Sequence, residues 1–315
     1  MLLIITPNPS LDRTMVFADL RLGAVLRTDQ VIVAAGGKGL NVARAARTLG
    51  QAALVCAPLG GLTGDLVAQL AAGEGIAGRW SQHTAGETRT CILLVSASGG
   101  DATALNEAGP IFGAADWATY QESILAAARD AAICLVSGSL PRGVEARQFA
   151  ALLGALGAAG QRVIVDTSGA ALSATLAARP YGIKVNAAEL GAALGYALPD
   201  IKTAAAALEQ LRESGLELAA VSLGAEGALA ADDSGIWWAC PPVIELVSTI
   251  GSGDSLLAGL ACGLLRGLAL PEALRLGVAC GSADALTIGG GLIRPHDVEQ
   301  LATQTQLKQV LAPRP

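Results

Sequence analysis

Short apolar runs alternate with longer helical segments through most of this 315-residue chain. The alternation is clearest from residue 116 onward, where a helical segment at 116–129 precedes an apolar run at 133–136, and a second helical segment at 146–156 precedes the run 162–165. Parallel strands need a crossover connection, usually a helix, so this pattern predicts a mostly parallel sheet with helices on both faces. We therefore predict an α/β fold.

Four β-prone pieces early in the chain have no helices between them. They lie at 14–17, 30–33, 88–95 and 103–105. Because such pieces cannot join a parallel sheet without crossovers of their own, we expect them to form a small separate sheet beside the main one. The chain is then one domain over residues 1–315, with a β lid formed by segments near 12–36 and 86–108.

The last third of the chain adds strands of another kind. The pieces 227–231, 236–239 and 245–247 are short and β-prone, and we expect them to pair antiparallel. Helices at 254–265 and 271–287 then close the fold. The stretch 255–265 is apolar on nearly all sides, which predicts a buried helix.

The composition excludes several classes of protein. Apolar residues make up 52% of the chain, but the longest uncharged run, residues 48–64, has 17 residues and contains Pro58. A membrane-spanning helix needs about 20 apolar residues. The N-terminus lacks the basic start of a signal peptide, and Pro7 interrupts its short apolar run. A net charge of −6 argues against a nucleic-acid partner. We expect neither membrane nor nucleic acid as partners.

The cysteines and histidines are few and scattered. The six cysteines form no Cys-x-x-Cys pair, and most lie within apolar runs, as reduced cysteines of cytoplasmic proteins do. We therefore expect a cytoplasmic protein. The two histidines, His83 and His296, are too few for a histidine-based zinc site or a convincing Ser/His/Asp triad. His83 lies between Gln82 and Thr84, which predicts a surface position.

The first of three glycine-rich loops is Gly36-Gly37-Lys38-Gly39, which leads into a predicted helix at 40–49. Glycines at a helix N-terminus let backbone N–H groups approach an anion, and a lysine adds a positive charge. The loop is not a Walker P-loop, because Gly39 rather than Ser or Thr follows Lys38. A flexible turn with an exposed lysine remains the alternative.

The second loop, residues 249–254, reads Thr-Ile-Gly-Ser-Gly-Asp and precedes the buried helix. Its amides would form an anion pocket, but the carboxylate of Asp254 would compete with an anion there. Asp254 is either an N-cap of the helix or a base that accepts a proton from a hydroxyl group. The loop lacks the third glycine of a dinucleotide fingerprint, which argues against a dehydrogenase.

The third loop, residues 222–227, is weak evidence alone, because a tight turn explains it equally well. Polar residues also follow several predicted strands. Ligands of open α/β sheets bind at the carboxyl ends of strands, so the recurrence of polar residues there favours a site at that edge. These residues are Asn8, Ser10, Asp12, Arg13, Ser137, Ser139, Asp166, Lys184, Asn186 and Glu189.

Together the motifs resemble the PfkB-type (ribokinase-like) sugar kinases. The resemblance rests on the order of five motifs between residue 6 and about residue 291: TPNPSLD at 6–12, GGKGLNVAR at 36–44, VSGSLP at 136–141, SLGAEG at 222–227 and GSGD at 251–254. It implies an ATP-dependent kinase with a ribokinase-like three-layer α/β/α sandwich and a β lid. It also implies Mg²⁺, and dimers formed through the lid, whose apolar strand at 90–95 would otherwise be exposed.

The resemblance also implies roles for individual residues. Asp254 would be the catalytic base, and Gly251, Ser252 and Gly253 the anion hole for the transferring phosphoryl group. The acceptor would bind to Asp12, Gly36, Gly37, Lys38, Asn41, Arg89 and Ser137. The nucleotide would bind to Lys184, Asn186, Glu189, Ser222, Leu223, Gly224, Ala225, Glu226, Gly227 and Thr249. Asn186 and Glu189, taken to share a helix face, would order water, and Glu189 would reach Mg²⁺ through it. Ser252 and Val185 depart from the usual Ala and Pro.

Two cationic residues bear on the acceptor. Lys38 and Arg89, expected to flank one end of the sugar pocket, favour a phosphorylated sugar. The motifs resemble the branch of 1-phosphofructokinases and tagatose-6-phosphate kinases. The first expectation is phosphorylation of fructose 1-phosphate to fructose 1,6-bisphosphate. Tagatose 6-phosphate or fructose 6-phosphate is the alternative acceptor, and a non-catalytic sugar-phosphate or nucleotide sensor is a further one, although Asp254 argues against it.

Overall fold

The computed structural model describes residues 1–96 and 102–312. A ten-stranded sheet runs through its centre in the order β14-β13-β12-β11-β10-β9-β8-β1-β4-β5. The strands from β11 to β5 pair parallel, and β11 to β14 pair antiparallel. Their bounds are Leu2–Ile5 (β1), Ala53–Leu59 (β4), Ala77–Gln82 (β5), Ile133–Ser137 (β8), Val163–Asp166 (β9), Gly182–Asn186 (β10), Leu218–Ser222 (β11), Ala228–Asp232 (β12), Gly235–Cys240 (β13) and Gln306–Leu311 (β14).

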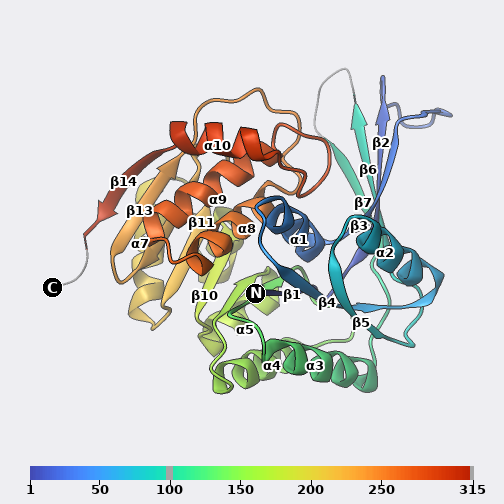
Figure 1. Cartoon of the computed structure of the whole chain (residues 1–315), viewed down its shortest axis with the longest axis horizontal. Coiled ribbons are helices and arrows are strands. Elements are labelled where there is room, and N and C mark those ends of the chain that lie inside the picture. Colours follow the sequence, from blue (N-terminus) through green and yellow to red (C-terminus); the bar gives the residue numbers. More distant parts are fainter. Residues whose placement is uncertain (97–101, 313–315) are drawn as a thin grey trace.

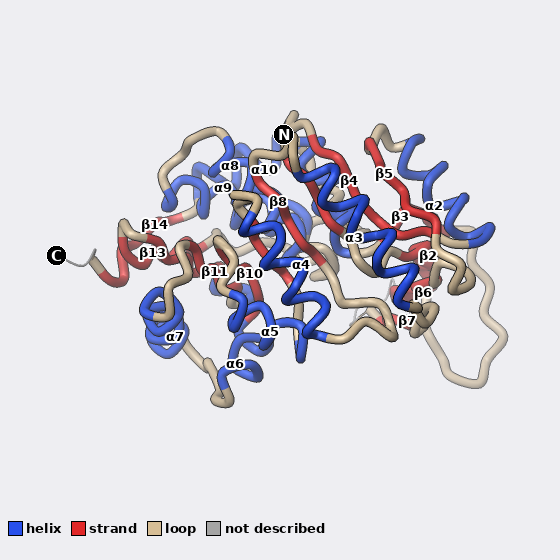
Figure 2. The backbone as a smooth tube through the Cα atoms, turned by 90° about the horizontal axis from the view of Figure 1, so that it is seen from below, coloured by secondary structure: helices blue, strands red, loops and turns tan. Residues whose placement is uncertain are grey.

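Helices cover both faces of this sheet, which confirms the predicted three-layer α/β architecture. One face carries Lys38–Thr48 (α1), Gly61–Gly73 (α2), Ser252–Leu265 (α8), Leu270–Asp284 (α9) and Pro295–Gln304 (α10). The other carries Ala114–Ala128 (α3), Ala146–Ala158 (α4), Gly169–Ala178 (α5), Ala187–Leu194 (α6) and Ile201–Glu213 (α7). Figure 2 looks onto the second face, with α3, α4 and α5 across the strands. Helices in the described ranges are too short to cross a membrane.

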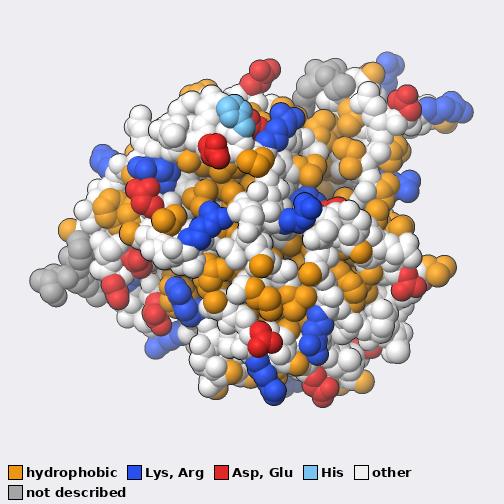
Figure 3. Space-filling view, viewed as in Figure 1, with side chains coloured by type: hydrophobic (Ala, Val, Ile, Leu, Met, Phe, Trp, Pro, Cys, Tyr) orange, Lys and Arg blue, Asp and Glu red, His pale blue; other side chains and the backbone are white. Residues whose placement is uncertain are grey.

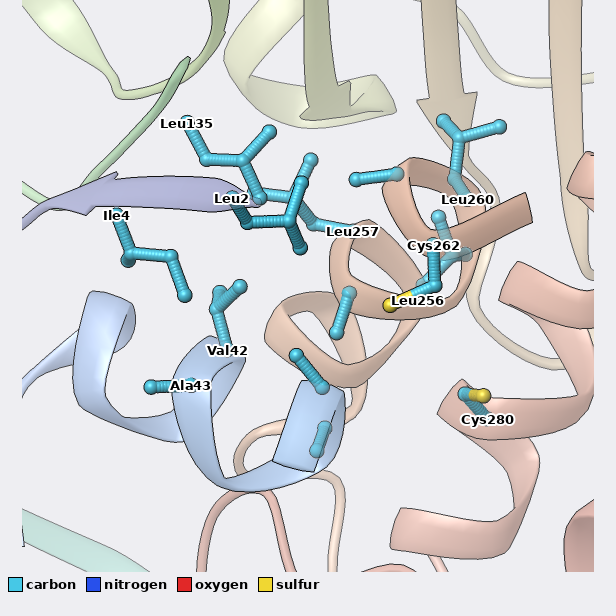
Figure 4. Close-up of a cluster of buried hydrophobic side chains, with 14 of the residues drawn as sticks. Leu2, Ile4, Val42, Ala43, Leu135, Leu256, Leu257, Leu260, Cys262 and Cys280 are labelled. Carbon is cyan, nitrogen blue, oxygen red and sulfur yellow. The ribbon is translucent and has the colours of Figure 1, made fainter. Parts of the chain in front are cut away.

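The buried helix α8 lies at the centre of the first face, as its all-round apolar sequence predicts. Leu257 packs toward Leu2 of β1 and Leu135 of β8 (Figure 4), and Leu260 belongs to the same buried cluster. Glycines allow α9 to approach closely: a Cβ atom on Gly259 would lie 2.8 Å from the Cα of Gly277. The N-terminus of α8 is thereby fixed at the edge of the sheet where the parallel strands end.

The early β-prone pieces form the predicted second sheet, in the order β3-β2-β6-β7. It projects beside the main body (Figure 1). The strands are Ser10–Phe17 (β2), Val31–Gly36 (β3), Thr90–Ser96 (β6) and Thr103–Asn106 (β7). We call this four-stranded sheet the lid sheet. Strand register places Asp12 on one of its faces, and Arg13 with its neighbours Ile92 and Val33 on the other.

Two predictions about local structure are wrong, and the sequence did not reveal three elements. Residues 245–247 form no strand, whereas β5, β14 and helix α10 were not expected. His83 is buried, with 8% of its surface exposed. Its ring packs against Phe112 in a tilted arrangement, with a centroid distance of 4.6 Å, and covers Gly60, where a Cβ atom would lie 2.4 Å from the imidazole. The polar neighbours Gln82 and Thr84 did not reveal this, because successive side chains in extended backbone point to opposite sides.

Candidate active site

The carboxyl ends of the central parallel strands bring the predicted polar residues to one edge of the sheet. Ser137 at the end of β8 lies opposite Asp166 at the end of β9, and Asn186 at the end of β10 lies opposite Ser222 at the end of β11. This is the edge at which ligands bind in open α/β sheets. The polar strand ends singled out from the sequence therefore meet at one edge of the sheet.

The first glycine-rich loop joins the lid sheet to α1 at this edge. Gly37 caps α1 with a φ of +100°, a conformation that favours glycine. A Cβ atom on Gly36 would lie 2.0 Å from the carboxylate of Asp12, so the absence of a side chain lets Asp12 lie against the loop. Ser10 donates a hydrogen bond to Asp12 at 2.5 Å. Burial raises the pKa of Asp12, opposed by hydrogen bonds from Ser10 and Gly37.

Asp254 does not cap the buried helix. Gly251 occupies the cap position with a φ of +89°, and Asp254 is the third residue of α8. Its side chain turns toward α1, where Nδ2 of Asn41 donates a hydrogen bond to Oδ2 of Asp254 at 2.9 Å. The alternative that Asp254 is an N-cap is therefore wrong. The carboxylate is available for chemistry at the edge of the sheet.

The electrostatic surroundings of Asp254 suit a general base. Burial and the nearby carboxylate of Asp166 raise its pKa to about 6, against the opposing effects of Lys38, Asn41 and Lys184. A base is most effective when its pKa lies near the working pH. Asp254 is therefore ionised at neutral pH and holds a proton more readily than an exposed aspartate.

Asp166 lies between two lysines from different parts of the chain. Its Oδ1 accepts from Lys38 of α1 at 2.8 Å, and its Oδ2 accepts from Lys184 of β10 at 2.7 Å. Burial opposes ionisation of Asp166, but Lys184 and Lys38 outweigh it and hold the pKa of Asp166 below its usual value. Asp166 is also expected to fix both ammonium groups beside Asp254. The sequence marked Asp166 only as a polar strand end.

The N-terminal turn of α8 forms an anion-binding surface beside these lysines. The first amides of a helix have no partner within the helix and carry its positive dipole end. Here they belong to Ser252, Gly253 and Asp254. A Cβ atom on Gly253 would lie 2.9 Å from Nζ of Lys184, so an ammonium group reaches the same surface. The amide of Ser252 also donates to the backbone oxygen of Thr249 at 3.4 Å. The amides of this turn and the two lysines together suit a phosphoryl group.

A hollow of about 330 Å³ opens at the same edge of the sheet, beside the ends of β10 and β11. Its lining includes five residues expected at the nucleotide: Asn186, Ser222, Leu223, Gly224 and Glu226. It adjoins a second hollow of about 630 Å³, and the two share Ala187, Ala188, Leu198 and Pro199. Five expected nucleotide residues are not part of either lining: Lys184, Glu189, Ala225, Gly227 and Thr249. A partly polar hollow beside an anion site that continues into a more apolar one has the chemistry to hold a nucleotide.

Asn186 and Glu189 do not share a helix face, contrary to expectation. Asn186 precedes α6 as its cap, and the two residues exchange hydrogen bonds: Oδ1 of Asn186 accepts from the Glu189 amide at 2.8 Å, and Oε2 of Glu189 accepts from the Asn186 amide at 3.0 Å. The other oxygen of Glu189, Oε1, lies 3.8 Å from Nζ of Lys38. The carboxylates of Glu189 and Asp166 thus lie near the same ammonium group, that of Lys38.

A divalent cation fits this centre through water rather than through a cage of side chains. No group of three or more His, Cys, Asp or Glu residues in ranges 1–96 and 102–312 could hold a metal ion. Magnesium commonly keeps several waters and binds through one or two carboxylates and the phosphates of a substrate. The outward oxygen of Glu189 and the nearby carboxylate of Asp166 are suitable partners for such waters.

Arg89 and Lys38 have different neighbours, so the expectation that they flank one end of the same pocket is not supported. Lys38 faces Asp166 and Glu189, whereas Nη2 of Arg89 donates to the backbone oxygen of Asn8 at 3.2 Å. Among the described residues, Nε of Arg89 has no hydrogen-bond partner. Arg89 also lies near the carboxylate of Asp12, on the side of the lid sheet.

Three further residues complete the picture of the site. Ser137 is fully buried, and its hydroxyl has no hydrogen-bond partner in the described parts of the chain. Asn41 is also buried and faces Asp254. Arg44, one turn after Asn41, was not singled out by the sequence, although it contacts Asn41 and three other segments.

The sequence pattern of the pfkB family of carbohydrate kinases matches residues 6–296, which include the three glycine-rich loops and the residues around them. The chain belongs to this family. It is therefore a phosphotransferase that acts on an alcohol group, and the kinases of this family use ATP. The predicted resemblance and the ribokinase-like fold are confirmed.

Curated relatives of this kinase match it over nearly their whole length. The 1-phosphofructokinase of Rhodobacter capsulatus is 36% identical over 96% of this chain and 95% of its own. The 1-phosphofructokinase of Escherichia coli K12 is 36% identical over 95% of this chain and 94% of its own. These values support a sugar-phosphate kinase and leave the particular sugar phosphate to be argued from the site.

Solved structures share the fold. Phosphofructokinase-2 from Escherichia coli in complex with substrates and products is 31% identical, with a TM-score of 0.90 over 96% of this kinase and 98% of that chain. The same enzyme in complex with fructose-6-phosphate has a TM-score of 0.88 and 30% identity, again over 96% of this kinase and 98% of that chain. Ribokinase from Arabidopsis thaliana, at 21% identity and a TM-score of 0.73, shares the fold alone.

Proposed function

We propose that this kinase transfers the γ-phosphoryl group of Mg-ATP to fructose 1-phosphate, giving fructose 1,6-bisphosphate. The observation that carries the proposal is Arg89, whose guanidinium lies beside Asp12 and leaves Nε without a partner in the described chain. A guanidinium binds a phosphate through two parallel hydrogen bonds. The identity to 1-phosphofructokinases supports the choice of fructose 1-phosphate.

The acceptor lies between the lid sheet and α8 in this proposal. Arg89 binds its phosphate, and Asp12, supported by the amide of Gly37, binds its hydroxyl groups beside Gly36. Asp12 is held for this by Ser10 and by the space that Gly36 leaves. The hydroxyl at the other end of the sugar then points to Asp254.

Phosphoryl transfer proceeds with Asp254 as the base. Asp254 accepts the proton of the acceptor hydroxyl as the hydroxyl oxygen forms a bond to the γ-phosphorus. The bond from that phosphorus to the oxygen it shares with the β-phosphate breaks, and ADP leaves with that oxygen. The amides at the start of α8 and the ammonium groups of Lys38 and Lys184 stabilise the charge on the transferring group.

Bound Mg²⁺ would supply positive charge to the β- and γ-phosphates of ATP. Glu189 and Asp166 are the residues that would hold its waters. Asn186, Ser222 and Gly224 border the hollow proposed for the nucleotide. Leu223 and Glu226 line the same hollow.

Fructose 6-phosphate is the second candidate acceptor. Phosphofructokinase-2 of Escherichia coli, solved in complex with fructose-6-phosphate, is 30% identical to this chain. Fructose 6-phosphate or tagatose 6-phosphate would be phosphorylated at the 1-hydroxyl, with the phosphate again on Arg89. A sensor without catalysis has no need for the buried Asp254 and its raised pKa.

Steady-state kinetics with Mg-ATP test the proposal. kcat/KM is measured for fructose 1-phosphate, fructose 6-phosphate and tagatose 6-phosphate, with unphosphorylated fructose as the control. We expect fructose 1-phosphate to exceed the other two by at least about tenfold. A preference for another sugar phosphate would contradict the choice of acceptor, and a preference for fructose would contradict the role of Arg89.

The proposal extends to the whole chain and its assembly. Residues 1–315 act as one kinase domain whose lid sheet covers the acceptor, and two copies pair through the opposite face of that sheet. That face carries apolar side chains with large exposure, including Leu105 at 51% and Val31 at 38%. Figure 3 displays hydrophobic side chains gathered on the projecting sheet. A dimer would cover them.

The cysteines support a cytoplasmic location. All six are free, and four of them are buried. Free thiols persist where the surroundings are reducing. We therefore retain the cytoplasm as the expected compartment.

A further inference from the structure

Arg44 of α1 is held by four segments that meet behind the active site. Its Nε donates to Glu74 after α2 at 2.6 Å, and its Nη2 donates to the backbone oxygen of Ala35 in β3 at 2.8 Å. Its Nη1 donates to Oδ1 of Asn41 at 3.1 Å and to the backbone oxygen of Gly290 at 2.7 Å. The side chain is 11% exposed. The guanidinium is therefore fixed in one orientation.

This orientation decides which way the Asn41 amide faces. Arginine has donors and no acceptor, so the atom of Asn41 that faces Arg44 must be the carbonyl oxygen. The NH₂ group must then face Asp254, and Nδ2 donates to Oδ2 of Asp254 at 2.9 Å. Without Arg44, the amide could turn its oxygen toward Asp254, where it would repel the carboxylate.

Arg44 also holds the loop that packs behind the anion-binding turn. Gly290 accepts from Arg44, and a Cβ atom on Gly290 would lie 2.5 Å from Nδ2 of Asn41. On the other side, a Cβ atom on Gly251 would lie 2.4 Å from the Cα of Gly290. The loop is thus packed between Asn41 and Gly251, the cap residue of α8. A shift of Gly290 would therefore displace both residues.

We propose that Arg44 is a positioning residue. Through Asn41 it fixes the position of the base Asp254, and through Gly290 it fixes the position of the anion-binding turn of α8. The inference rests on the proposed role of Asp254 as the base. It assigns no contact between Arg44 and substrate. Arg44 acts from behind the site, from the same helix that carries Lys38.

The readout is the acid limb of the pH profile of kcat, where activity falls as the base becomes protonated. The charged groups around Asp254 are Asp166, Lys38 and Lys184, together with Asp284 of α9, and the proposal leaves all four in place. The hydrogen bond from Asn41 stabilises the charged form of Asp254. Its loss therefore moves the acid limb to higher pH.

Arg44→Met is the first test variant. We expect kcat to fall about tenfold and the acid limb to move up by about one pH unit, since a hydrogen bond to a charged group is lost. KM for Mg-ATP and for the sugar phosphate should change little. Arg44→Lys keeps the charge but cannot reach four acceptors from a planar fork, so its acid limb should move in the same direction.

Arg47→Met is the matched control. Arg47 lies one turn further along α1, is exposed, and packs beside Gly75 after α2, on the side away from the site. This substitution removes a guanidinium group from the same helix, near the same segment after α2, and we expect it to leave the pH profile of kcat unchanged. Asn41→Ala should move the acid limb as Arg44→Met does, and the double variant should move it no further than Asn41→Ala alone.

Three results would overturn the inference. Arg44→Met could lower Tm without moving the acid limb, Arg44→Lys could retain the wild-type profile, or the shifts of Arg44→Met and Asn41→Ala could add. Asp254→Asn, measured in parallel, separates this failure from failure of the proposed function. A nearly inactive Asp254→Asn with an unmoved acid limb in Arg44→Met refutes only the role of Arg44.

Discussion

The ammonium group of Lys184 lies against Gly253, at 2.9 Å from where a Cβ atom on that glycine would be. Lys184 is 3% exposed and is held by Asp166 at 2.7 Å, so it has little freedom to move aside. The glycine in the second loop thus serves a close approach between a lysine from one strand and the N-terminus of a buried helix. This places two sources of positive charge on one anion-binding surface.

Gly253→Ala should therefore impair phosphoryl transfer. We expect the new methyl group to displace Lys184 and lower kcat about tenfold, as loss of part of an anion-stabilising site does. Gly154→Ala in α4 is the control, because nothing lies within 4 Å of its added Cβ atom. It should keep full kcat and raise the free energy of unfolding by about 0.5–1 kcal/mol. Full kcat in Gly253→Ala would contradict the assignment of the anion-binding surface.

Arg89→Ala tests the phosphate-binding role of Arg89. A lost charge-assisted hydrogen bond costs about 1.5–3 kcal/mol, so KM for the sugar phosphate should rise roughly 10–100-fold. KM for ATP should change little, because Arg89 contacts Asn8 and not the nucleotide hollow. Arg21→Ala, which removes an exposed arginine paired with Asp19, should leave both constants unchanged. An unchanged sugar-phosphate KM in Arg89→Ala would refute this role.

Asp284, the last residue of α9, makes stability depend on pH. Burial raises its pKa to about 7 from an ordinary value of 3.8, so the folded protein holds this proton more tightly than the unfolded chain. The contribution to stability is full below pH 3.8 and is lost as pH rises through about 7. Asp284→Asn should therefore raise Tm more at pH 8 than at pH 5.

The comparison for Asp284 is Asp233→Asn, at an exposed position after β12. Thermal melting of both variants at the two pH values checks the prediction. Asp233→Asn should shift Tm equally at both. An equal shift at both pH values for Asp284→Asn would show that its carboxyl group ionises alike in the folded and unfolded chain.

Leu105→Glu tests the proposed dimer. Leu105 lies beside Ile92 on the face of the lid sheet opposite Asp12, and a charge placed in a covered apolar surface is costly. Light scattering at micromolar concentration should find a dimer for the wild type and a monomer for Leu105→Glu. Leu62→Glu, which alters an 82% exposed leucine of α2, should remain dimeric. A fully active wild-type monomer would rule out the dimer.

The sequence predicted the edge of the sheet and most of the loops that meet there, because their chemistry is local. Glycine runs before helices and polar residues after apolar strands are visible in a single stretch of chain. Asp166 and Arg44 are different, since their roles come from partners far away in sequence: Lys38 is 128 residues from Asp166, and Gly290 is 246 residues from Arg44. No local pattern reveals such contacts.

The errors have the same origin. His83 has polar neighbours in sequence but packs on Phe112, and Asp254 stands where an N-cap would be plausible although Gly251 takes that position. Lys38 and Arg89 were expected to flank one pocket because both are cations that can bind a phosphate group. In the structure, Lys38 at the start of α1 contacts Asp166, whereas Arg89, just before β6 of the lid sheet, contacts the backbone oxygen of Asn8.

The central claim is that Asp254 takes the proton of the acceptor hydroxyl, and Asp254→Asn tests it most directly. Asn is nearly the same size, and Asp254 does not cap α8, so Tm and the binding of Mg-ATP and sugar phosphate should persist. We expect kcat to fall roughly 10²–10⁴-fold. Wild-type activity should fall as pH decreases through about 6. A folded, ligand-binding Asp254→Asn that retains more than about a tenth of wild-type kcat would contradict the assignment.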